Sequence, residues 1–203
     1  MEIPIVSRLM RMEPSLAVLL VVTIGAVAIV GFVGVVTTPV GILVGDSYWE
    51  YVSAFHGLGA TVFLVGSTIA VYLAWRLYVG EIRAFKDLKV MAAFSTVMSA
   101  FTIAFGNWIY IAYRGTGGPR SYFLETPGLE TIHETFFEFK EFIALFTLPM
   151  FLVSTFILWR YGDSLAKNKE ARAAASLPLL LGWVFLIMAY TLGAAITKLR
   201  GVG

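Results

Sequence analysis

Five long runs of apolar residues constrain the fold of this chain more than any other feature. A helix needs about 20 apolar residues to cross the hydrocarbon core of a bilayer, and five segments reach that length. These segments are Pro14–Val36, Tyr51–Val79, Leu88–Tyr113, Leu129–Trp159 and Ala173–Ile196. They predict an all-α polytopic membrane protein, in which residues 1–203 form a single bundle of five transmembrane helices. We expect the first run to be retained as a helix, although the arginines before it resemble the start of a signal peptide.

The composition supports this class and excludes several others. The chain has 203 residues, of which 59% are hydrophobic and 14% are charged, whereas a soluble domain is about 25% charged. The formal net charge of +2 is too small to indicate binding to nucleic acid. The chain contains no cysteine, which excludes disulfides, iron–sulfur clusters, thiolate metal sites and c-type haem attachment.

The positions of the basic residues predict an orientation in the membrane. Most of them lie before the first span or in the loops after the second and fourth: Arg8, Arg11, Arg76, Arg83, Lys86, Lys89, Arg160, Lys167, Lys169 and Arg172. Segments rich in lysine and arginine remain in the cytoplasm. We therefore expect a multi-pass protein of the cell membrane, with its N-terminus in the cytoplasm and its C-terminus outside.

The two histidines of the chain lie on different predicted helices and toward the same outer face. His56 is near the start of the second span, and His133 is near the start of the fourth. Two imidazoles from different helices of a bundle are the usual axial ligands of a b-type haem. We therefore predict one haem b with its iron between His56 and His133. Small residues such as Gly59 beside His56 leave room for the macrocycle, or for close packing of a neighbouring helix.

Residue counting places the two histidines at different depths. His56 lies 20 residues before Arg76, and His133 lies 27 residues before Arg160. At ~1.5 Å per residue, His133 should lie roughly 10 Å farther out. A haem that bridges both histidines then requires a tilted helix, or a second helix that continues past Arg76 toward Val79. The residue of the fourth helix that is level with His56 is Lys140 or its neighbour Glu141.

The start of the fourth span carries a dense group of ionisable residues. At helical spacing, Glu134, Glu138 and Glu141 form one stripe, and His133, Phe137 and Lys140 form the neighbouring stripe. Ionisable groups at the apolar boundary are costly, and they usually face a partner, water or a cofactor. Glu138, Lys140 and Glu141 are therefore candidates for a proton relay. The alternative is that these turns of the helix stand in water above the membrane.

A divalent metal is a further alternative for the same region. Carboxylate and imidazole groups from several helices hold metal ions in bundle proteins, and His56, His133, Glu138 and Glu141 could form such a set. The two Glu-x-x-His pairs typical of those sites are not both present here, because only Glu130 and His133 have that spacing.

Two arginines flank the glycine-rich loop between the third and fourth spans. Arg114 and Arg120 lie there, and Tyr110 precedes them. A guanidinium group pairs bidentately with a carboxylate, so these arginines are candidates to bind haem propionates. The alternative is that each extends from the membrane interface into water.

The layout resembles that of small membrane b-type cytochromes, which serve as quinone-linked subunits of respiratory enzymes. The resemblance rests on His56, His133 and the predicted helices. It implies haem b, electron transfer, and contact with quinone and with other membrane subunits. The chain differs from the six-helix, four-histidine b561 cytochromes, because two histidines hold at most one bis-histidine haem.

Two other functions remain open. The first is a transporter or proton relay that uses Lys140, Glu141 and the histidines. The second is a structural or assembly subunit, in which the polar start of the fourth helix docks a partner. The sequence pattern assigns no enzymatic reaction, redox partner or oligomeric state.

Overall fold

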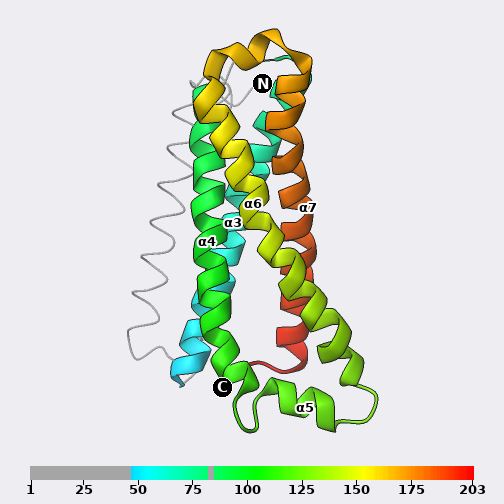
Figure 1. Cartoon of the computed structure of the whole chain (residues 1–203). Helices are drawn as coiled ribbons and strands as arrows, with labels where there is room; N and C mark the ends of the chain where they lie inside the picture. Colours follow the sequence, from blue (N-terminus) through cyan, green and yellow to red (C-terminus); the bar gives the residue numbers. More distant parts are fainter. Residues whose placement is uncertain (1–46, 82–84) are drawn as a thin grey trace, which may run out of the picture.

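The computed structural model describes residues 47–81 and 85–203, and every element in these ranges is a helix (Figure 1). Four helical segments are long and apolar enough to cross a membrane. They are α3 (Tyr48–Tyr78), α4 (Phe85–Arg114), the π-helical segment η2 (Ile132–Phe137) continued by α6 (Glu138–Tyr161), and α7 (Lys169–Leu199). The connections contain a short helix, α5 (Pro119–Glu125), and a 3-10 segment, η3 (Gly162–Lys167).

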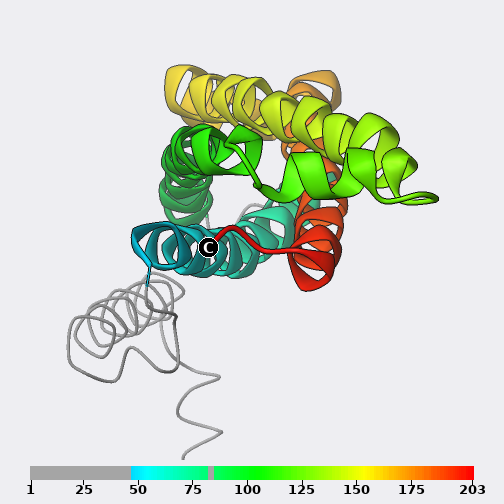
Figure 2. The same ribbon diagram turned by 90° about the horizontal axis from the view of Figure 1, so that it is seen from below.

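The four long helices form an up-and-down bundle. Each one packs against the next along the chain, and α7 closes the ring against α3. Figure 2 shows this ring along the bundle axis, with α5 lying across one end. Short connections between successive helices favour this antiparallel arrangement. We call the two ends of the bundle the α5 end and the η3 end.

Local sequence signals explain several helix ends. Ser47 and Glu50 form a capping box at the start of α3, because each side chain accepts a hydrogen bond from the backbone N–H of the other, at 3.2 and 2.9 Å. Asn168 caps α7 by accepting from the N–H of Ala171 at 3.0 Å. Gly162 ends α6 with a φ of +51°, a conformation that residues with a β-carbon rarely adopt.

The structure supports four of the five predicted spans as helices. Predicted spans 51–79, 88–113, 129–159 and 173–196 correspond to α3, α4, η2 with α6, and α7. The predicted span 14–36 lies outside the described residues and stays a prediction. The glycine-rich connection after Arg114 also holds α5, which the sequence analysis did not predict. Pro119 is its first residue, where the missing N–H of proline has no consequence.

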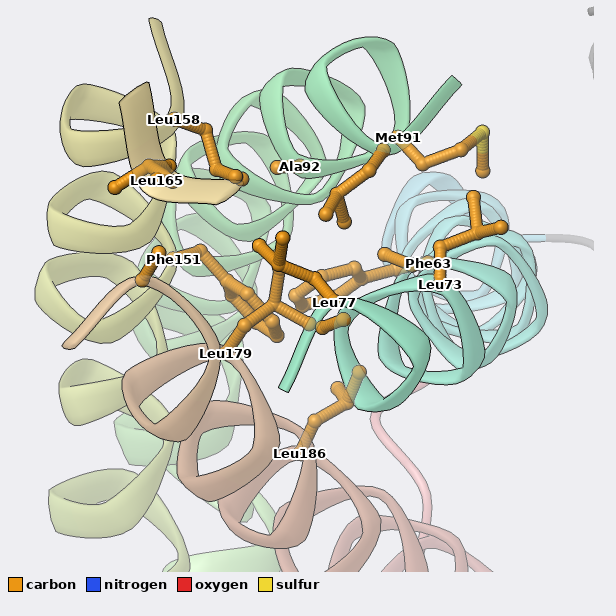
Figure 3. Close-up of a cluster of buried hydrophobic side chains, with 14 residues drawn as sticks. Phe63, Leu73, Leu77, Met91, Ala92, Phe151, Leu158, Leu165, Leu179 and Leu186 are labelled. Carbon is orange, nitrogen blue, oxygen red and sulfur yellow. The ribbon is translucent and has the colours of Figure 1, made fainter. Parts of the chain in front are cut away.

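A hydrophobic cluster fills the η3 half of the bundle (Figure 3). In this cluster Phe63 and Phe151 meet edge to face, with ring centroids 5.4 Å apart and almost no exposed surface. The cluster also contains leucines from α3, α6 and α7: Leu73, Leu77, Leu158, Leu179 and Leu186. A smaller cluster at the α5 end consists of Tyr113, Phe123, Phe137 and Ile196. The core is therefore divided into two parts along the bundle axis.

Hydroxyl groups link α4 to α6 inside the bundle. Ser99 and Thr147 share a buried hydrogen bond of 2.6 Å, and Thr96 and Thr155 share one of 2.8 Å. Such bonds, together with small residues, hold membrane helices together where the surrounding lipid provides no hydrophobic driving force. They also fix Ser99 and Thr147 at the same level along the bundle axis.

The outer surface of the bundle is strongly apolar. Val97, Ile111 and Phe156 are each more than 60% exposed, at 66%, 64% and 62%. A helix that is apolar on its outward face as well as its inward face is typical of a membrane span. The arrangement is that of a multi-pass membrane protein whose helices contact lipid.

Candidate functional site

A cavity of ≈ 390 Å³ lies between the four long helices, between the two hydrophobic clusters. Phe63, Ser99 and Thr147 line its inner end, next to the cluster that fills the η3 half. Arg200 and Gly201 line its other end and are exposed, so the cavity opens at the α5 end of the bundle. Most of its wall is apolar, and the polar groups on it are therefore candidates for specific contacts.

Lys140 extends its side chain into this cavity from the first turn of α6. Its ammonium nitrogen lies 5.0 Å from the centre of the Phe137 ring, a cation–π distance. Within the described part of the chain, no carboxylate oxygen lies within 4.0 Å of it. The carboxyl group of Glu141, the next residue, lines the same cavity and is half-buried. The cavity thus holds a cation with capacity to donate hydrogen bonds to a ligand.

His56 lines the cavity from α3. Its ring lies against Gly106 of α4, where a β-carbon would approach the Cε1 atom to 3.3 Å. Its Nδ1 atom is buried and has no hydrogen-bond partner in the described structure. Lys140 lines the same cavity from α6, which agrees with the similar depth that residue counting predicts for the two residues. His56 therefore offers an unused nitrogen atom to a ligand.

Three parallel, stacked aromatic rings line the cavity. Tyr113 and Phe137 stack with centroids 3.9 Å apart and planes 6° from parallel. Tyr110 lies 5.8 Å from each of them, with its plane within 13° of both. All three line the cavity, and we call them the aromatic wall. A flat ligand could stack against such a surface.

His133 is held beside the aromatic wall and does not line the cavity. Its Nε2 atom accepts a hydrogen bond from Nε of Arg120 at 3.2 Å, and its Nδ1 atom lies 3.1 Å from the Tyr113 hydroxyl. Because a guanidinium group only donates, Nε2 carries no proton and Nδ1–H donates to Tyr113. The side chain is 3% exposed, and both its nitrogens are engaged.

These positions bear on the predicted haem ligands. His56 lines the cavity and its Nδ1 atom has no hydrogen-bond partner, but that atom is buried, so the ring would have to turn toward the cavity to act as an axial ligand. His133 does not fit that role in this arrangement, since it would have to release Arg120 or Tyr113 and turn toward the cavity. Among the described residues, no three histidine, aspartate or glutamate side chains gather as a metal site. Haem binding stays a prediction.

The other residues that we predicted to contact haem do not lie together. Arg114 is exposed and lies over the outer face of Tyr110, 4.4 Å from the ring centre. Arg120 is occupied by His133. Gly59 is buried against α4, where its β-carbon would lie 3.2 Å from Phe101, so it serves helix packing. Of this predicted set, Tyr110 alone joins His56 on the cavity wall.

The π-helical segment η2 determines which side chains of the fourth span face inward. The N–H of Glu138 donates to the carbonyl of His133, five residues earlier, and so widens the helix by one residue. His133 and Phe137 are buried and Lys140 follows on the same side, whereas Glu134 and Glu138 are exposed. Glu138 does not line the cavity, so of the candidate relay residues only Lys140 and Glu141 face it.

Sequence reasoning missed several polar residues of the cavity. Hydroxyl groups line it from all four helices: Ser53, Ser99, Thr102, Thr147, Tyr190 and Thr197. The signal was present on α4, where Ser99, Gly106 and Tyr113 recur at seven-residue spacing, which puts them on one helix face. Such a stripe is equally typical of helix packing, so it does not identify a cavity by itself.

No protein-family model, no curated protein and no solved structure matches this chain. The chemistry of the cavity is therefore the basis for assigning a function. The cavity combines a largely apolar wall, a flat aromatic surface, one ammonium group and one free imidazole nitrogen. This combination suits a ligand that is flat and apolar, with hydrogen-bond acceptors at its edge.

Proposed function

We propose that this protein binds a molecule of the quinone class in the cavity between its four spans, as a membrane subunit of a quinone-linked electron-transfer system. The observation that carries the proposal is the position of Lys140 and His56 on one cavity that the aromatic wall also lines. A quinone head group is a flat ring with two carbonyl oxygens, and it lacks hydrogen-bond donors in its oxidised form. It therefore complements donors on a largely apolar surface.

The contacts of such a head group follow from the positions of the side chains. The Lys140 ammonium donates to one carbonyl oxygen, and His56 donates to the other when its proton is on Nδ1 and the ring turns this buried nitrogen toward the cavity. The ring stacks on Tyr110 and Phe137, which already lie parallel to each other within 10°.

The apolar tail of a quinone needs a route to the lipid. Leu145 lines the cavity and is also 53% exposed on the outer surface of α6. The cavity therefore reaches the lipid-facing side of the bundle as well as its α5 end. A tail that leaves beside Leu145 keeps its apolar surface in lipid.

Titration of the purified protein with short-tailed ubiquinone and menaquinone analogues tests this proposal. We expect saturable binding, measured by quenching of tryptophan fluorescence and by calorimetry. Lys140→Met keeps the length of the side chain and removes a charged hydrogen-bond donor, which is worth about 1.5–3 kcal/mol or roughly tenfold to a hundredfold in Kd. Lys198→Met is the matched control, because Lys198 is exposed on α7 and does not line the cavity. Equal affinities of the two variants would contradict the proposal.

A b-type haem is the second candidate, and the unpartnered Nδ1 of His56 favours it. Expression with haem supplied should then give a red protein with a Soret band, and His56→Ala should remove that band. His133→Ala tests the bis-histidine hypothesis separately. A change from a low-spin to a high-spin spectrum means that His133 leaves Arg120 to bind the iron, and an unchanged spectrum means that it does not.

The proposed orientation places the mouth of the cavity on the outer face of the cell membrane. The η3 end of the bundle carries the basic residues Arg76, Lys89, Arg160, Lys167 and Arg172. If these remain in the cytoplasm, then α5, the aromatic wall and the cavity mouth face outward. The quinone head group would then exchange at the outer half of the membrane.

A further inference from the structure

The η3 half of the bundle contains buried hydroxyl groups in addition to its hydrophobic cluster. Ser67, Ser95, Ser154 and Ser176 come from the four different long helices, and each has no exposed surface. They lie beyond the cavity, in the part of the bundle that is otherwise filled by phenylalanine and leucine. Serine is a poor choice for such a site if packing alone matters, because alanine has nearly the same size and no polar atom.

Helix register gives the order of these groups along the bundle axis. Ser99 and Thr147 form a hydrogen-bonded pair in the cavity wall, at its inner end. Ser95 is one turn beyond Ser99 on α4, and Ser154 is about two turns, or roughly 10 Å, beyond Thr147 on α6. Both steps lead away from the cavity and toward the η3 end.

Ser176 extends the same row on α7. Gly182 packs against Phe151, with its β-carbon position 3.4 Å from the ring, and Ser176 lies six residues from Gly182 in the direction of the η3 end, or roughly 9 Å at helical rise. Asp87, which is 6% exposed, lies near the η3 end of α4. We call Ser67, Ser95, Ser154 and Ser176 the hydroxyl row; it leads from the floor of the cavity toward the η3 end, where Asp87 lies.

Two of these four hydroxyls form hydrogen bonds, and two do not. Ser67 and Ser95 donate to backbone carbonyls of their own helices, at 3.1 and 2.8 Å. The hydroxyls of Ser154 and Ser176 have no hydrogen-bond partner in the described structure, although both are completely buried. A polar group in this position is normally satisfied by internal water. Water bound between α6 and α7 would satisfy these hydroxyls.

The contact of Phe63 with Phe151 separates this row from the cavity. Phe63 lines the cavity, and its ring meets that of Phe151 with centroids 5.4 Å apart. Figure 3 shows both rings in the middle of the cluster, between the four helices. An apolar constriction of this kind blocks a water chain, and hydrophobic constrictions act as gates in channels.

We propose that the hydroxyl row is the second half of a proton path that begins in the cavity, and that the Phe63–Phe151 contact is its gate. A proton enters from the cavity, where Lys140, Glu141 and His56 are ionisable groups and Arg200 lies at the mouth. Each water or hydroxyl oxygen accepts one proton and releases another to its neighbour, so no bond of the chain is changed. The proton leaves at the η3 end near Asp87. This path does not depend on which molecule binds in the cavity.

Proton flux into liposomes that contain the full chain tests the proposal. A potassium gradient with valinomycin supplies the driving voltage, and an entrapped pH-sensitive dye reports proton entry. Opening the gate with Phe151→Ala should raise the flux about tenfold over wild type. Phe123→Ala is the matched control, because Phe123 is equally buried but belongs to the cluster at the α5 end; it should leave the flux unchanged.

A second set of variants identifies the route. Adding Ser154→Ala and Ser176→Ala to Phe151→Ala should return the flux to near the wild-type level. Flux that is unaffected by the two serine substitutions would show that they serve helix packing only, and would overturn the proposal. Equal flux in Phe151→Ala and Phe123→Ala, or a parallel rise in potassium leak without valinomycin, would also overturn it. If Phe151→Ala does not fold, Phe151→Leu replaces it, with a smaller rise expected in the same direction.

Discussion

Gly193 of α7 lies directly beside the side chain of Lys140 on α6. A β-carbon at Gly193 would lie 3.4 Å from the Cε atom of Lys140, and both residues line the cavity. The absence of a side chain at Gly193 therefore leaves space through which Lys140 reaches the cavity. The position of the Lys140 ammonium group therefore depends on Gly193, a small residue of the neighbouring helix.

Gly193→Leu should move the Lys140 ammonium group away from its present position. A leucine side chain occupies the space that the lysine stem now fills, so we expect quinone affinity to fall about as far as in Lys140→Met, roughly tenfold or more. Gly193→Ala should bind almost normally, because 3.4 Å is an ordinary contact with the end of a flexible side chain. Ala195→Leu is the control for added bulk, since Ala195 is exposed on the same helix. Titration of the three variants with the same quinone analogue gives the comparison.

Gly66→Ala should destabilise the bundle. A β-carbon at Gly66 would overlap the ring of Phe94 where α3 and α4 pack most closely. Forcing the ring aside in a packed interface costs about 1–3 kcal/mol. The free energy of unfolding, from titration of mixed micelles with dodecyl sulfate, measures this loss.

Gly57→Ala, on the same helix, should not destabilise the bundle. Nothing lies within 4 Å of the position of its β-carbon, and alanine favours a helix over glycine by about 0.5–1 kcal/mol. This variant should be as stable as wild type or slightly more stable. A similar loss in both glycine variants would show that the contact with Phe94 does not determine the effect.

The sequence predicts the helices well because their signal is local. Spans of about 20 apolar residues give the positions of α3, α4, α6 and α7 to within a few residues. Counting residues from Arg76 and Arg160 also places Lys140 level with His56, because helical rise is nearly constant. These inferences need no knowledge of which helices are neighbours.

The site could be predicted only in part, because it depends on rotation of the helices and on contacts between them. The stripe of His133, Phe137 and Lys140 indicates a shared face, but periodicity does not say that His133 binds Arg120 and so faces away from the cavity. The partner arginine lies on α5, which is too short to show a periodic signal. The π-helical hydrogen bond from the N–H of Glu138 to the carbonyl of His133 also shifts the register of the helix. No recognisable sequence pattern announces this shift.

Tyr113→Phe should destabilise the α5 end without changing the cavity wall. The ring and its stacking on Phe137 remain, but the buried Nδ1–H of His133 loses its acceptor. An unsatisfied buried donor costs about 1–3 kcal/mol. Tyr122→Phe is the matched control, because the Tyr122 side chain is 39% exposed. Unfolding in mixed micelles measures stability, and quinone titration should show little change in affinity for Tyr113→Phe. A variant as stable as Tyr122→Phe would mean that the His133–Tyr113 bond contributes little.

The orientation of the bundle can be measured directly, because the chain contains no cysteine that would interfere with labelling. Thr116 and Lys167 are exposed in the connections at opposite ends of the bundle. The basic residues around η3 predict that this end is cytoplasmic. A membrane-impermeant maleimide added to intact cells should therefore label Thr116→Cys and leave Lys167→Cys unlabelled until the cells are opened. The reverse pattern would place the cavity mouth on the cytoplasmic face and invert the direction of the proposed proton path.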